Sequence, residues 1–68
     1  MTRMWEAVAA PGCRDDLARW ALRTWPEAEV FVSEDDRVVA IGGGAGDAPE
    51  DLLVRAPHAW EFERVPRS

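Results

Sequence analysis

The sequence lacks most of the features that hold a very small protein together. It contains one cysteine, Cys13, and one histidine, His58. An internal disulfide is therefore excluded, and so is the paired Cys/His spacing of a structural zinc site. No metal site is expected, and a fold of this size must find its support in apolar packing or in a second chain.

Positive charge is also scarce. All 8 basic residues are arginines, and the formal net charge is −5. Proteins that bind nucleic acid or an anionic membrane surface usually carry a basic face, so neither partner is expected. No stretch approaches the roughly 20 apolar residues of a membrane span, and the first residues do not resemble a signal peptide. Together with the unpaired cysteine, this predicts a cytoplasmic protein.

Aromatic residues, by contrast, are plentiful for the length. The chain of 68 residues is expected to be one domain, residues 1–68, and a domain of this size buries only roughly 60% of its unfolded surface. Its six large aromatic residues are Trp5, Trp20, Trp25, Phe31, Trp60 and Phe62. One small sheet and a helix offer too little interior for all of them. This excess predicts a homodimer.

The stretch VVAIGGGAGDAPEDLL contains four glycines within Gly42–Gly46. A strand, a glycine loop and a helix often bind phosphate. Here Asp47 and Pro49 occupy places where a G-x-G-x-x-G motif needs glycine, and no GK[ST] follows. Acidic residues at the start of the next helix would also repel an anion. We therefore predict a flexible connector and no nucleotide or other cofactor.

Hydrophobic periodicity predicts six elements. They are strands over 4–9, 28–33, 37–41 and 59–65, a main helix over 13–25, and a short helix over about 48–56 that Asp47 and Glu50 would cap. The main helix has a wide apolar face made of Leu17, Ala18, Trp20, Ala21, Leu22 and Trp25. Pro26 should end it, because the residue before a proline disfavours helical geometry.

The order β-α-β-β-α-β predicts an α+β fold of the ferredoxin-like type. Its antiparallel sheet would have the strand order 4-1-3-2, with both helices on one face. The predicted hairpin is apolar on both faces, although an antiparallel sheet exposed to water is normally polar on one side. A second copy of the sheet is the simplest cover.

Three segments resemble the antibiotic-biosynthesis-monooxygenase-like family of dimeric α+β barrels. AAPGCRDDLARWALR resembles its first turn and helix, AEVFVSEDDRVVAI its hairpin, and LLVRAPHAWEFERV its second helix and the entry to the last strand. The resemblance spans residues 4–65 and implies two sheets packed face to face. It also implies that a small aromatic or apolar molecule is bound, or oxidised without a cofactor. This chain is shorter than usual, chiefly at the second helix.

Candidate site residues gather at one end of the predicted sheet. The last strand runs antiparallel to the first, which brings His58 to the same end as Cys13. Trp20 and Trp60 would add apolar surface nearby. A concave apolar site with a few polar groups is the usual ligand pocket, so we predict that His58, Trp20 and Trp60 border the main cavity and that Cys13 lies within reach. No catalytic residue is assigned.

Two other interpretations remain open. The element order and the turn at Pro11–Gly12 also suit a regulatory module of the ACT type, which would bind an amino acid at that turn. Alternatively, the protein is purely structural: the tryptophans serve core and dimer packing, His58 caps a strand and Cys13 fills a turn. The sequence does not decide whether the protein is an enzyme.

Overall fold

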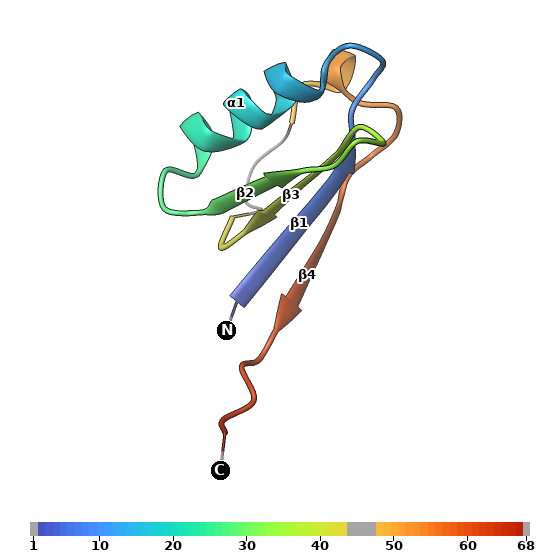
Figure 1. Ribbon diagram of the computed structural model, residues 1–68. Helices are drawn as coiled ribbons and strands as arrows, with labels where there is room; N and C mark the ends of the chain where they lie inside the picture. The colour runs from blue at the N-terminus through green and yellow to red at the C-terminus, as the bar shows by residue number, and fades with distance from the viewer. Residues whose placement is uncertain (1, 44–47, 68) are drawn as a thin grey trace.

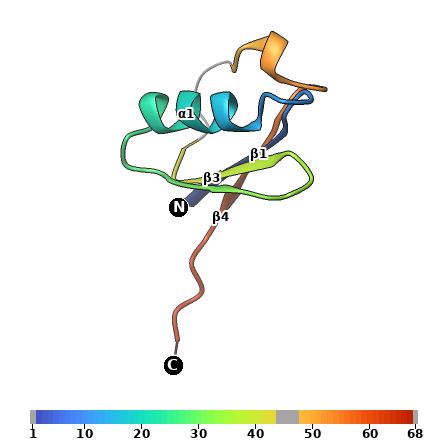
Figure 2. The ribbon, with the colours of Figure 1, turned by 45° about the horizontal axis from the view of Figure 1, so that its top comes forward.

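The computed structural model describes residues 2–43 and 48–67. Its elements are β1 (Thr2–Val8), α1 (Arg14–Thr24), β2 (Glu29–Val32), β3 (Arg37–Ile41), the 3-10 helix η1 (Glu50–Leu52) and β4 (His58–Phe62). The strands form one sheet, and α1 lies across one side of it (Figure 1). The turned view in Figure 2 also shows the C-terminal residues extending away from the body. The predicted α+β class with a four-stranded antiparallel sheet is confirmed.

The strands follow one another across the sheet in the order β2-β3-β1-β4, and all three pairings are antiparallel. Glu6 on the central strand β1 lies between Val39 on β3 and His58 on β4, and Phe31 on β2 is opposite Val39. Directly opposed residues point to the same side of a sheet. The register therefore places each strand residue either on the side of α1 or on the opposite side, which we call the open face.

The core lies between α1 and the sheet. Trp5, Ala7 and Ala9 alternate along the first strand and its continuation, and all three are buried. This is the pattern of a strand with one face against a helix. Leu17 and Ala21, four residues apart on one face of α1, are fully buried against it. Val38 and Ala40 of β3 complete the buried set.

Three tryptophans fill one side of this core. The ring centroid of Trp5 lies 5.9 Å from that of Trp20 and 5.2 Å from that of Trp25, and the Trp20 and Trp25 centroids are 5.1 Å apart. A side chain at Gly43 would place its Cβ 2.6 Å from the Trp25 ring, so bare backbone is required there. The predicted core positions of Trp20 and Trp25 are confirmed. Leu22 was predicted to belong to the apolar face of the helix that packs on the sheet, but its side chain is 53% exposed.

The second predicted helix, over about 48–56, is wrong. Only Glu50–Leu52 is helical, as a single 3-10 turn that follows Pro49 in an extended conformation. The next residues bond to the end of β1 instead: the Val54 amide donates to the Val8 carbonyl at 3.0 Å, and the Ala10 amide donates to the Leu52 carbonyl at 2.8 Å. These strand-like bonds use backbone groups that a longer helix would need. The capping role predicted for Asp47 lies outside the described residues.

The shortened segment leaves β4 without a cover. Every residue of His58–Phe62 is exposed, on both faces of the strand. On the helix side, Arg3 donates to Glu61 at 2.9 Å across the β1–β4 pair. This surface ion pair stands where a second helix would otherwise pack, so β4 is held to the body mainly by its pairing with β1.

The remaining boundaries differ from the prediction by a few residues. The first strand begins earlier than predicted, and α1 ends at Thr24, just before Trp25 and Pro26. The hairpin strand Arg37–Ile41 lies where it was expected. The last strand is shorter, ending at Phe62, and the following residues run on as exposed chain.

Candidate functional site

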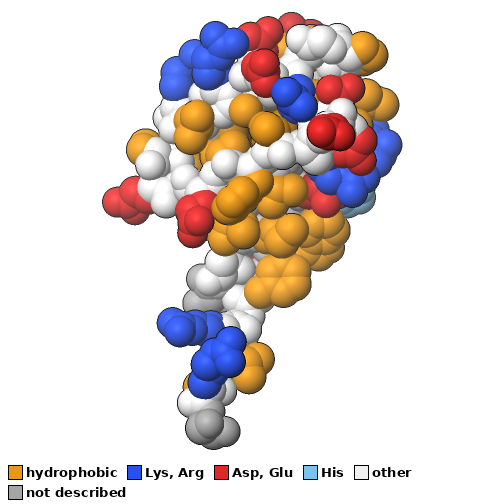
Figure 3. All heavy atoms as spheres, viewed as in Figure 1, with side chains coloured by type: hydrophobic (Ala, Val, Ile, Leu, Met, Phe, Trp, Pro, Cys, Tyr) orange, Lys and Arg blue, Asp and Glu red, His pale blue; other side chains and the backbone are white. Residues whose placement is uncertain are grey.

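The open face of the sheet carries the most unusual surface of the molecule. Phe31 and Phe62 are each 50% exposed, Trp60 is 44% exposed and Ile41 is 37% exposed. The register places all four on the open face, together with the half-buried Met4 and Val39. Figure 3 shows hydrophobic side chains gathered over the sheet on the side away from α1. An exposed apolar patch of this kind usually marks an interaction site.

The sequence produces this surface because the hairpin strands are apolar at nearly every position. In β2, Val30 points to the helix side and Phe31 to the open face. In β3, Val38 is buried under α1, while Val39 points to the open face. A sheet with one face in water would alternate apolar and polar residues. The absence of that alternation in the hairpin explains why the open face is apolar as well as the face under α1.

Among the described strand residues, four that can ionise lie on the open face. Glu29 is at the β2 edge and Arg37 is at the end of β3 beside the hairpin turn, whereas Glu6 stands on the central strand directly opposite His58. The imidazole of His58 stacks on the indole of Trp60, with ring centroids 5.6 Å apart and planes 15° from parallel. The polar groups nearest the middle of this face are therefore one carboxylate and one imidazole.

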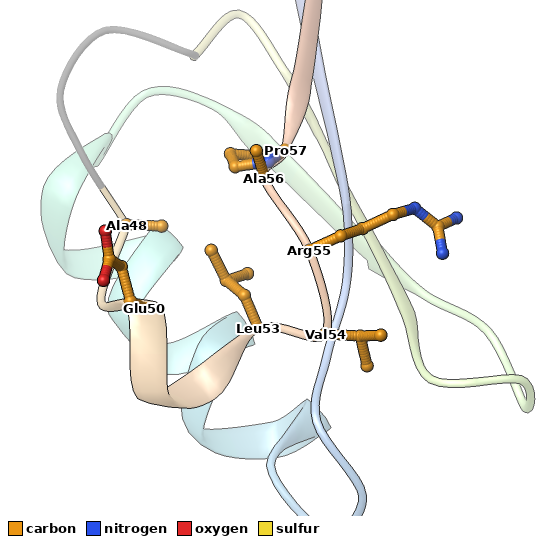
Figure 4. Close-up of a pocket in the computed structure, with 7 residues that line it drawn as sticks. All are labelled: Ala48, Glu50, Leu53, Val54, Arg55, Ala56 and Pro57. Carbon is orange, nitrogen blue, oxygen red and sulfur yellow. The ribbon is translucent and has the colours of Figure 1, made fainter.

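A separate pocket of about 590 Å³ lies on the helix side, next to η1 and the segment that leads to β4. Its described lining consists of Ala48, Glu50, Leu53, Val54, Arg55, Ala56 and Pro57. Figure 4 shows that Leu53 and Ala56 point into the pocket, whereas Val54 and Arg55 point away from it. The volume suits a small molecule, and the inner wall is apolar.

The four predicted site residues do not come together. Trp20 belongs to the tryptophan cluster under α1, and Cys13 is the residue that precedes that helix. His58 and Trp60 lie on the open face, across the sheet from Trp20. None of the four lines the 590 Å³ pocket, although that pocket does reach Pro57, at the predicted end of the sheet. A role for these residues in ligand binding stays a prediction.

Comparison with known proteins identifies no relative of this chain. No protein-family model, curated protein or solved structure matches this chain. The open face and the pocket beside η1 are the two features of the molecule that bear on its function.

The acidic hairpin turn at Ser33–Asp36 is a solvated turn, as its composition suggests. The Ser33 hydroxyl donates to the Asp35 carboxylate and accepts a bond from the Arg37 amide at 3.2 Å. The hydrogen bond from Ser33 lowers the pKa of Asp35 below its usual value. Asp36 adopts a positive φ of 65°, a conformation that aspartate tolerates.

Among the described residues, no group of three or more His, Cys, Asp or Glu side chains could hold a metal ion.

Cys13 is part of the turn into α1. Its amide donates to the Ala10 carbonyl at 2.9 Å, and its carbonyl accepts the Leu17 amide at 2.9 Å. Its side chain makes no cap bond to the helix.

Within residues 2–43 and 48–67, no helix is both long enough and apolar enough to cross a membrane. Five apolar residues of the open face were not predicted as site residues: Met4, Phe31, Val39, Ile41 and Phe62. The apolar residues on both sides of the hairpin pointed to most of them.

Proposed function

We propose that this protein functions as a homodimer in which two ferredoxin-like subunits pack the open faces of their sheets together. This is the arrangement of the dimeric α+β barrels that the sequence resembles. The strand order β2-β3-β1-β4 and the single covered face support it. The observation that carries the proposal is the row of exposed apolar side chains on the open face, where Phe31, Trp60 and Phe62 are 44–50% exposed.

The total exposed area supports the same proposal. The chain exposes 5004 Å², whereas a folded monomer of this mass typically exposes roughly 4,300 Å². The difference of about 700 Å² is close to the roughly 800 Å² that each partner buries in a standard interface. The extended C-terminal residues contribute to this excess, and so do the exposed side chains of the open face, Phe31, Ile41, Trp60 and Phe62. Two sheets packed about 10 Å apart would bury these side chains from both copies.

Sedimentation equilibrium at micromolar concentration tests the dimer. We expect a mass near twice the 7.6 kDa of the chain, because burying two apolar faces drives association. A mass that stays at one chain over the whole micromolar range would overturn the proposal.

We further propose that the pocket beside η1 binds a small apolar or aromatic molecule. Its walls are mostly apolar, and of the two ionisable residues in its described lining, Glu50 and Arg55, the arginine points away. That lining offers no set of acid, base and nucleophile, so binding is the activity that we propose for it.

Titration with naphthalene, followed through the NMR signals of the Leu53 methyl groups, tests this binding. Ala56 points into the pocket and Val54 points away from it. We expect Ala56→Phe to fill the space and weaken binding about tenfold or more, a change of about 1.4 kcal/mol or more. The matched variant Val54→Phe should bind naphthalene as the wild type does. Equal effects of the two substitutions would show that the probe binds elsewhere.

A further inference from the structure

Among the described residues, Glu6 is the only acidic residue on the open face that does not lie at a sheet edge. It occupies the central strand β1, where it is half-buried, between Val39 on one side and His58 on the other. Packing a second copy on this face would remove much of the water around Glu6. A carboxylate that loses water is costly unless a positive group or hydrogen-bond donors replace it.

His58 is the best-placed group to supply that positive charge. It stands directly opposite Glu6 across the β1–β4 pair, where the Cβ atoms of opposed residues are about 5 Å apart. Histidine is also the side chain that ordinarily changes its charge between about pH 5 and 8. The stacked ring of Trp60 adds a second stabilising contact, since the face of an indole attracts a cation.

The other charged groups of the sheet are less well placed. Arg37 lies diagonally from Glu6, at the exposed end of β3 beside the hairpin turn, and Glu29 lies at the outer edge on β2. Arg3 and Glu61 point to the helix side and pair with each other at 2.9 Å. Among the described residues, no ion pair joins Glu6 to any of these groups.

We propose that Glu6 and His58 link the association of the two open faces to proton uptake, so that the dimer is strengthened as the pH falls from about 8 to about 6. This inference rests on the dimer proposed above. With a neutral imidazole, two carboxylates, one from each copy, would enter the interface uncompensated. With a protonated imidazole, each copy would bring a positive charge that neutralises the Glu6 beside it. Association therefore favours the protonated form, and by reciprocity protonation favours association.

The dissociation constant, measured by sedimentation at about pH 8 and about pH 6 at one ionic strength, tests the link. One proton taken up per copy predicts a dimer about tenfold tighter or more at the lower pH. His58→Gln should remove most of this difference. Glu6→Gln should also remove it and, because it deletes the buried charge, should tighten the dimer at about pH 8. The matched control Glu29→Gln, a carboxylate at the edge of the same face, should keep the wild-type pH dependence.

The outcomes separate the two proposals. A dimer with the same dissociation constant at both pH values would overturn the proton link and leave the homodimer standing, and would point to Arg37 as the group that neutralises Glu6. A pH dependence that persists in His58→Gln would also overturn it. A monomer at both pH values would overturn the homodimer itself.

Discussion

Replacing Trp5 with alanine should leave the chain largely unfolded at 25 °C. Trp5 is 2% exposed and contacts both other tryptophans of the core, at centroid distances of 5.9 and 5.2 Å. Truncating a buried tryptophan costs about 3–5 kcal/mol. At roughly 0.05–0.15 kcal/mol per residue, a domain of this length has only about 3–10 kcal/mol in total. A domain of this size lies near the lower end of that range, so the loss approaches the whole free energy of unfolding. Near-ultraviolet circular dichroism and urea titration measure it.

Trp60→Ala is the matched control for this effect. Trp60 is 44% exposed on the open face and contributes nothing to the core under α1. At a protein concentration low enough to keep the chain monomeric, its removal should change the free energy of unfolding by less than about 1 kcal/mol. Equal urea midpoints for the two variants would contradict the core described here.

The α+β class could be predicted because local patterns and long-range packing agree in most of the chain. The hairpin strand Arg37–Ile41 and the buried positions Leu17 and Ala21 follow directly from hydrophobic periodicity. The second helix could not be predicted correctly, because its failure depends on contacts distant in sequence. Residues 52–54 bond to residues 8–10, and no local propensity reveals that competition.

The four candidate site residues were predicted to lie near one another, and the structure places them on different sides of the sheet. His58 and Cys13 were expected at one end of the sheet because of their positions along the chain. Position along a strand does not determine which side of the sheet a residue faces. A change of one residue in register moves a side chain to the other face. The pairing Glu6↔His58 puts the imidazole on the open face, while Cys13 immediately precedes α1 on the other side. The apolar second face of the hairpin was visible in the sequence, because β2 and β3 have apolar residues on both sides.

The most direct test of the open face as the dimer interface compares two aspartate substitutions by sedimentation equilibrium. Phe31 is 50% exposed on the open face, and Leu22 is 53% exposed on α1, so the two sites are matched in exposure and differ in location. A charge placed in an apolar interface is strongly disfavoured, whereas a charge on a solvated helix surface is tolerated. We predict that Phe31→Asp sediments as a monomer and Leu22→Asp as a dimer, with both variants folded by circular dichroism. A dimer that survives Phe31→Asp and is lost in Leu22→Asp would contradict the proposed interface and place it on the helix side.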